Sequence, residues 1–466
     1  MKASRALRLF LVAAVAASPG ALSAQGFGLN EIGSCAIGRA FAVTASPCRD
    51  ASAIYWNSAA TTSLTGWSVV AGVTAISLKG DFKQDTTGRT WDADVPTQWV
   101  PHVFVNYHPT NGKFAFGVGA YVPYGLTSQW PDSFPGRFSA KKASLKDFYI
   151  QPNIAWQITP DWSIGGGPVY GHSSVELIQA IDLSTQPLPT GGTFGLVGIP
   201  TGTEFARATL KGDASAWGAQ IALAGQFNKT WFIGARYLTP LNFKYDNADA
   251  TFKQVNTGLT IGGTLQPPLT AGTPVDALVA SQFTSGALVS QKVSTEIKNP
   301  AQFQAGIGYA GFKNWLVEAD YSWVGWSSFE SLPINFQGAA SGSNRTLIED
   351  YNNSSGIRLG AEYTIPTDGW KLRAGFAAAQ SAAPEVTVTP LLPEQDRQYG
   401  TFGVGVPFMK TWAVDASYAH VFTGGRRGRL AERSNVANPN GTAAQLNTGV
   451  FDLSANIFSL TLKANF

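Results

Sequence analysis

Hydrophobic and polar residues alternate with a period of two along much of this chain. In residues 456–466, apolar side chains occupy every even position from Phe458 to Phe466, and polar side chains occupy the odd positions between them. Residues 315–323, 357–363 and 370–376 follow the same pattern. Because successive side chains of a strand point to opposite faces, this period predicts β-strands with one apolar face. A soluble β-sandwich and a membrane barrel would both show it.

The spacing of the strands separates these two architectures. The pattern predicts fourteen strands, at residues 67–82, 98–108, 114–126, 146–158, 161–178, 205–227, 231–246, 300–311, 314–328, 354–364, 369–379, 398–407, 411–422 and 456–466. Six short turns alternate with seven long connections, as in bacterial outer-membrane barrels, and closure removes the strand edges that hydrocarbon does not tolerate. We therefore expect an all-β fold, a transmembrane antiparallel β-barrel of about 14 strands over residues 66–466.

The amino terminus predicts export. Lys2, Arg5 and Arg8 precede a short apolar run at 9–17 and a small-residue site ending at Ala24. This is typical of a secretory signal peptide, residues 1–24, because a membrane anchor needs about 20 apolar residues. Residues 25–65 lack the period of two, and we expect them to form an N-terminal hatch, or plug, inside the lumen. The predicted location is the bacterial outer membrane.

Composition excludes several classes of function. Charged residues make up 14% of the chain, and 33 Lys+Arg against 30 Asp+Glu give a net charge of +3, which offers no case for nucleic-acid binding. Four dispersed His and two Cys predict no metal site, no cofactor and no catalytic triad, so we expect no enzyme. A lipase or protease barrel is therefore disfavoured. The remaining alternative is a general porin or structural barrel, and a monomer is the default.

Cys35 and Cys48 both lie in the predicted hatch. In an oxidising periplasm they are expected to form a disulfide, which would contribute about 3 kcal/mol by the loop-entropy relation. The alternative is a pair of buried free thiols.

Two predicted outer loops, at about 179–213 and 247–299, are unusually apolar for exposed segments. We expect them to capture a hydrophobic small molecule, with outer-membrane lipid and lipopolysaccharide as neighbours; the alternative is that they only pack against each other as a cap. A carboxylate contact is possible at His172 and Ser174, although a lone His is more often structural. The candidate capture residues are Phe194, Leu196, Val197, Ile199, Val275, Leu278, Val279 and Phe283.

Several motifs resemble the FadL/TodX family of outer-membrane transport proteins. The resemblance rests on residues 26–31 (GFGLNE), 38–41 (GRAF), 50–52 (DAS), 56–59 (WNSA), 122–126 (VPYGL) with Trp130 and 136–138 (GRF), 326–329 (WSSF) and 392–397 (LPEQDR). It implies a fourteen-stranded barrel with an N-terminal hatch that imports long-chain fatty acids or aromatic hydrocarbons. The hatch residues carried over are Phe27, Asn30, Glu31, Asp50, Asn57, Ser58 and Ala59.

The resemblance also implies a lateral opening. In the family a kink in the third strand lets substrate leave sideways into the membrane, and Pro123 and Gly125 match that position. A strand end, where Pro and Gly stop the pairing, is the alternative. The chain departs from the family pattern in its hatch, where Ser58 replaces a proline, Val43 replaces a glycine and two cysteines are added.

Overall fold

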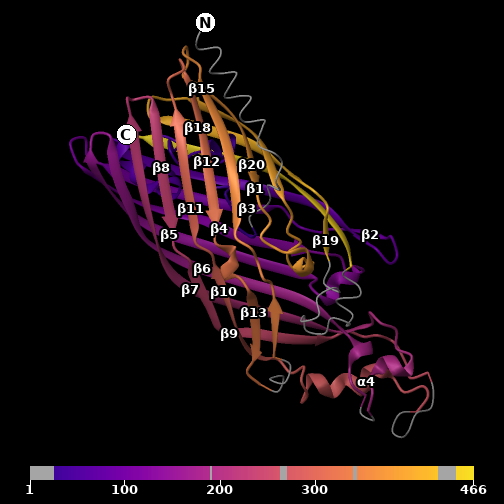
Figure 1. Ribbon diagram of the computed structural model, residues 1–466. Coiled ribbons are helices and arrows are strands. Elements are labelled where there is room, and N and C mark those ends of the chain that lie inside the picture. Colours follow the sequence, from indigo (N-terminus) through magenta and orange to yellow (C-terminus); the bar gives the residue numbers. More distant parts are fainter. Residues whose placement is uncertain (1–25, 189–190, 263–269, 339–343, 429–447) are drawn as a thin grey trace.

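The computed structural model describes residues 26–188, 191–262, 270–338, 344–428 and 448–466. The predicted signal peptide, residues 1–24, lies outside the described residues. The chain forms a closed antiparallel β-barrel of fourteen strands, in which β8 with β9, and β10 with β11, each follow one course (Figure 1). The barrel closes where β1 (Gly66–Gln84) pairs with β20 (Gly449–Asn465), from Ser68↔Asn465 to Gln84↔Gly449.

The other barrel strands follow in chain order. They are β3 (Gln98–His108), β4 (Phe114–Gln129), β5 (Lys142–Thr159), β6 (Trp162–Asp182), β7 (Glu204–Phe227), β8 (Trp231–Leu238), β9 (Leu241–Gln254), β10 (Gln291–Asn299), β11 (Gln302–Tyr309), β12 (Trp315–Val324), β15 (Ser354–Thr364), β16 (Lys371–Ala379), β17 (Arg397–Pro407) and β18 (Trp412–Thr423). Short strands β2 (Thr90–Asp92), β13 (Ser331–Phe336), β14 (Arg345–Ile348) and β19 (Arg426–Gly428) extend the wall at the loop end.

The all-β barrel prediction is confirmed, but several predicted boundaries are wrong. The predicted strand 231–246 breaks at Thr239 and Pro240, and the predicted strand 300–311 begins earlier, as β10, and breaks at Pro300. A proline has no N–H to give to the ladder, so both breaks follow from the sequence. The long connections are shorter than predicted, at 183–203 and 255–290, because the strands continue beyond the apolar band, where alternation no longer marks them.

The two faces of the wall differ in polarity. Outward positions of β7 carry Trp217 and Ile221, which are 69% and 62% exposed. Inward positions carry buried charges in an ion-paired chain, in which Arg373 contacts both Glu362 and Asp415 at 2.7 Å. Apolar side chains outside and paired charges inside are what a membrane barrel requires. The described residues contain no helix long and apolar enough to cross a membrane.

Residues 26–65, the luminal segment, fill the interior beside the wall. The segment contains the short helices α2 (Ser34–Gly38) and α3 (Ala53–Trp56) and a 3₁₀ turn at Ser58–Ser63. Inward side chains of the strands bind its backbone: Asp320 accepts the N–H groups of Val43 and Thr44, each at 2.9 Å. A disulfide joins Cys35 to Cys48 within it. The segment is therefore anchored to the wall by hydrogen bonds as well as by packing.

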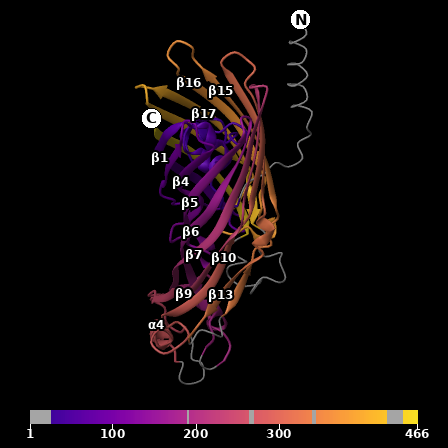
Figure 2. The same cartoon turned by 90° about the vertical axis from the view of Figure 1, so that its left-hand side faces the viewer.

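At the end opposite the carboxyl terminus, the wall is uneven. Figure 2 shows β9, β13 and α4 (Val275–Val279) extending beyond the rest of the barrel. The loops at this end are the long connections, so this is the outer rim that the strand pattern predicts.

Candidate functional site

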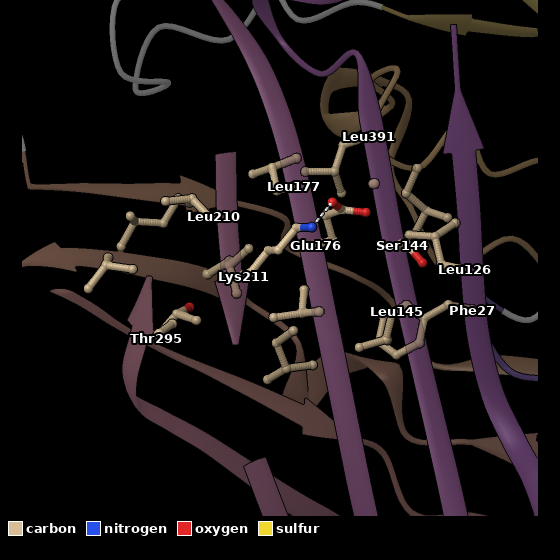
Figure 3. Close-up of a pocket in the computed structure, with 18 of the residues that line it drawn as sticks. Phe27, Leu126, Ser144, Leu145, Glu176, Leu177, Leu210, Lys211, Thr295 and Leu391 are labelled. Atoms are coloured by element: carbon tan, nitrogen blue, oxygen red, sulfur yellow. Dashed lines mark ion pairs between the residues drawn. The ribbon is translucent and has the colours of Figure 1, made fainter. Parts of the chain in front are cut away.

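An apolar cavity of about 80 Å³ lies inside the outer half of the barrel, and its exposed lining is apolar (Figure 3). Inward side chains of β4, β5, β6, β7, β9, β10 and β13 surround it, and Phe27 of the luminal segment closes one side. Among the lining side chains are Leu126, Leu145, Val175, Leu177, Leu210, Val293, Ile297 and Leu332. An apolar solute is the ligand that such a lining favours.

Three charged residues lie next to this cavity, but their charged groups are on the outer face of the wall and not inside the cavity. Glu176 pairs with Lys211, with 2.7 Å between Oε1 and Nζ, and also contacts Lys142. These residues alternate along their strands with the buried Leu145 and Leu177, so their side chains belong to the outer face, where Lys211 is 62% exposed. The cavity itself therefore offers packing rather than an ion pair.

Phe27 belongs to a short stretch, residues 26–31, that we call the N-terminal latch. Its ring lies edge-on to those of Trp326, Phe329 and Tyr124, with centroids 4.5, 5.7 and 6.1 Å apart. The latch pairs with β4 through its backbone: the N–H of Gly125 donates to the Phe27 carbonyl at 2.9 Å, and the Leu29 N–H donates to Pro123 at 2.8 Å. The latch thus pairs with the edge of β4 through one isolated antiparallel bridge, Gly28↔Tyr124.

That edge is free because the β3–β4 ladder is short. It runs only from Tyr107↔Phe116 to Val103↔Ala120, although β4 continues to Gln129. The β4–β5 register also shifts between Tyr121 and Tyr124. Pro123 lies within this shift. Proline has no backbone N–H to donate to a ladder, so an interrupted register costs no hydrogen bond at this position. The wall therefore has a break between β3 and β4, which the latch covers.

A second cavity of about 610 Å³ passes through this break. Its inner lining includes Phe27, Leu29 and Glu31, and its outer lining includes Trp99 and Lys146. Trp99 is 68% exposed on the apolar outer face of β3. The two cavities share Phe27, Leu126 and Leu145, so the latch stands between the apolar cavity and the outer face.

Side chains of β17 and of the loop that precedes it hold the latch. Arg397 donates from Nη2 to the Gly26 carbonyl at 2.9 Å, and Glu394 accepts the Gly26 N–H. Glu394 also accepts the N–H groups of Ala382 and Ala383 at 2.9 and 2.7 Å. Burial raises the pKa of the Glu394 carboxyl and that of Glu31 above the ordinary value of 4.5.

The predicted capture residues cluster together, away from the cavity. Phe194, Ile199, Val275 and Val279 are buried in one small core, with Val197, Leu278 and Phe283 packed against it. Leu196 is 79% exposed. None of the eight is among the residues lining either cavity. The two loops do meet, as a cap at the outer rim.

The predicted carboxylate contact lies on the outer face. His172 alternates with the buried Ser173 on β6, and its Nε2 is 3.9 Å from Oδ1 of Asp213 with half of its side chain exposed. Ser174 is its half-buried neighbour and, like His172, lines neither cavity. The structure thus does not bring this pair to the apolar cavity.

The predicted hatch residues divide between the latch and the wall contacts. Asn57 donates from Nδ2 to the Leu223 carbonyl of β7 at 3.0 Å and to Thr44 at 2.8 Å, and it accepts the Ala59 N–H. Asp50 lies 3.7 Å from Lys463 of β20, and Ser58 is buried. Asn30 is also buried; its Oδ1 accepts from Arg358 at 3.1 Å. These contacts fix the luminal segment and leave the latch as the part that borders the cavities.

Comparison with known proteins identifies the chain. The family model described as outer membrane protein transport protein (OMPP1/FadL/TodX) matches residues 13–466. The chain belongs to this family. It is 26% identical over 430 residues to the 47 kDa outer membrane protein of Pasteurella multocida, covering 90% of this chain and 92% of that protein. It is also 26% identical over 442 residues to the long-chain fatty acid transport protein of Escherichia coli K12, covering 88% and 92%.

Solved structures share the fold of this family member. A Pseudomonas aeruginosa FadL homologue aligns with a TM-score of 0.76 at 20% identity, covering 95% of this chain and all of that one. The Pseudomonas putida toluene transporter TodX aligns with a TM-score of 0.64 at 14% identity, covering 95% and 99%. The predicted family and the predicted outer-membrane location are both confirmed.

Proposed function

We propose that this protein takes up hydrophobic compounds, long-chain fatty acids or aromatic hydrocarbons, across the outer membrane. The observation that carries the proposal is an apolar cavity inside the barrel that adjoins a break in the wall closed only by the latch. Relatives of this chain are a long-chain fatty acid transport protein and, by fold, a toluene transporter. A fatty-acid chain and toluene are both apolar, as the lining of the cavity requires.

The first step is transfer of the solute from water. Leu196, which is 79% exposed on the cap of the outer loops, offers an apolar contact at the rim, and the cavity inside the outer half of the barrel buries the solute more completely. Each methylene group buried contributes about 0.8 kcal/mol, so a long alkyl chain gains several kcal/mol even when only partly enclosed. This gain draws the solute past the lipopolysaccharide layer without an energy source.

Release is lateral in this proposal. Displacement of the latch would join the apolar cavity to the second cavity, which reaches the lipid-facing side chain of Trp99. A route along the barrel axis would instead require the luminal segment to leave. That segment is bound by side chains of many strands, including Glu318, which accepts the Ala45 N–H at 2.7 Å, and Gln220, which donates to the Tyr55 carbonyl at 2.9 Å.

The same observation argues against the general porin. A porin conducts through an open polar lumen, whereas the lumen here holds buried residues 34–45 of the luminal segment. The expected conductance for small ions is accordingly low.

The test uses Gly125→Arg. A Cβ atom at position 125 would lie 2.9 Å from Leu29 Cδ1, so a long side chain there competes with the latch for the break. We expect saturable binding of radiolabelled oleate or toluene to the purified variant as to the wild type, with uptake into cells lost. Gly424→Arg is the matched control, since nothing lies within 4 Å of its Cβ position. Absence of binding to the wild type, with ion conductance instead, would overturn the proposal in favour of a porin.

A further inference from the structure

The barrel wall contains a second interruption, between β7 and β9. The β7–β8 ladder ends at Gln220↔Leu238, and pairing of β7 resumes with β9 at Lys211↔Asp249. Between these pairs no ladder joins residues 212–219 to residues 239–248, apart from the hydrogen bond that the Thr239 N–H donates to the Ala219 carbonyl. The interruption is thus framed by regular ladder above and below, and we call it the β7–β9 window. The β8–β9 side of this interval is two residues longer than the β7 side and contains Pro240, so the register of the ladder cannot continue through it.

Side chains close the window in place of a ladder. At the outer end, a Cβ on Gly212 would lie 2.6 Å from the Cβ of Ala248, so the two backbones touch there. At the inner end, Ala219 and Thr239 exchange two hydrogen bonds, of 2.9 and 3.0 Å, one of them through the Thr239 hydroxyl. The outer end of the window is therefore closely packed but has no ladder pair of its own, so it can part without breaking one.

The window lies between the apolar cavity on its inner side and the upper limit of the apolar outer face. On its inner side, Leu210 and Ala248 line the apolar cavity. On its outer side, Trp217 is 69% exposed and Tyr237 is 38% exposed, and they are the last large apolar side chains on β7 and β8 before the polar positions Asp213 and Lys244. Aromatic side chains of this kind mark the membrane–water interface. The window therefore opens at the rim of the lipid band.

We propose that the β7–β9 window is a side entrance, through which alkyl-chain molecules already partitioned into the outer interface reach the apolar cavity. An amphiphile at that depth places its head beside the polar outer positions and its chain toward the window. The proposal rests on the proposed function, because it supplies an entry route to the same cavity. It differs from capture by the loop cap, which takes the solute from water, and from the β3–β4 break, which is on the exit side.

Cross-linking tests the window directly. In Gly212→Cys/Ala248→Cys the two Cβ atoms are close enough for a disulfide after a small shift, and the bond would lock the outer end. Thr209→Cys/Thr251→Cys is the matched control, since these residues are paired in the ladder just above the window. The probe is cis-parinaric acid, mixed rapidly with purified protein in detergent, with oxidised and reduced samples compared and the wild type given the same reagents.

We expect oxidation of the window pair to slow both association and dissociation of the probe at least tenfold, with Kd unchanged within twofold and with recovery on reduction. Unchanged rates in the cross-linked window pair, or an equal slowing in the Thr209/Thr251 control, would overturn the entrance. Failure of the wild type to bind the probe would instead overturn the proposed function itself. The reduced window pair, rather than the wild type, is the reference for the oxidised sample, because Ala248 lines the cavity. Heat-modifiable migration of the reduced pair in SDS gels shows that its barrel is folded.

A surface variant gives an independent reading. Asp213→Cys lies on the outer face of the window, where the native side chain is 67% exposed, and Asp249→Cys lies just above it, at 62%. A bulky maleimide on position 213 should slow the probe at least fivefold, whereas the same label on position 249 should not. Equal rates for the two labelled proteins would contradict the proposal.

Discussion

Replacing Phe27 with alanine should release the latch. The side chain is 4% exposed and packs against three aromatic rings, with Trp326 nearest at a centroid distance of 4.5 Å. Phe→Ala substitutions at buried sites cost about 3–5 kcal/mol. The backbone hydrogen bonds of the latch remain, among them two to β4 and those of Gly26 to Arg397 and Glu394. If the loss falls on latch docking, about 3 kcal/mol shifts the docking equilibrium by roughly 150-fold.

Amide hydrogen exchange reports this equilibrium. The Gly125 N–H, which donates to the Phe27 carbonyl, should lose protection by two orders of magnitude in Phe27→Ala, while amides of the β1–β20 ladder keep theirs. Phe402→Ala is the control, because that side chain is 55% exposed on the outer face. Wild-type protection of Gly125 in Phe27→Ala would refute the claim that the ring holds the latch.

Three further outcomes are expected. Cys35→Ser/Cys48→Ser should lower the free energy of unfolding of the luminal segment by about 3 kcal/mol in denaturant titrations, whereas an unchanged midpoint would assign the disulfide no stabilising role. The free energy of unfolding should rise as pH falls from neutral toward about 4.5, because burial raises the pKa of Glu394 in the folded protein and folding therefore takes up a proton; Glu394→Gln should flatten this profile, and a rise with pH would contradict the sign. Gly375→Val should displace Arg39 and Ala40, which follow α2, since a Cβ there would lie 2.7 Å from that of Ala40; unaltered exchange at the Ala40 amide would refute this packing.

Alternation in the sequence predicts the barrel because lipid and lumen impose opposite polarities on the two faces of each strand. It works best within the apolar band, as in β20, where every second side chain from Phe458 to Phe466 is apolar. It fails where the strands rise above lipid: β10 and the upper halves of β7 and β9 are polar outside and only partly apolar inside. The predicted loops were too long for that reason.

The candidate site was less visible in the sequence. Apolar loop residues such as Phe194 and Val279 predicted an exposed apolar surface for capture, yet these residues pack into a core of their own. The cavity is instead lined by inward strand residues such as Leu145 and Val293, whose pattern matches that of any buried strand. His172 illustrates a parity problem, because a shift of one residue decides whether a side chain faces the lumen or the outside. Pro123 and Gly125 were more useful for prediction, because proline and glycine are the residues that indicate an interrupted ladder within a strand.

The disulfide of the luminal segment constrains how this protein is made. Cys35 and Cys48 are each 5% exposed within the closed wall, so a disulfide isomerase, itself a folded protein, cannot approach their sulfur atoms. An enzyme that forms or corrects this bond would therefore act while the polypeptide is still open in the periplasm, before β1 meets β20. Biogenesis would then follow a fixed order, in which the interior is oxidised first and the wall is wrapped around it afterwards.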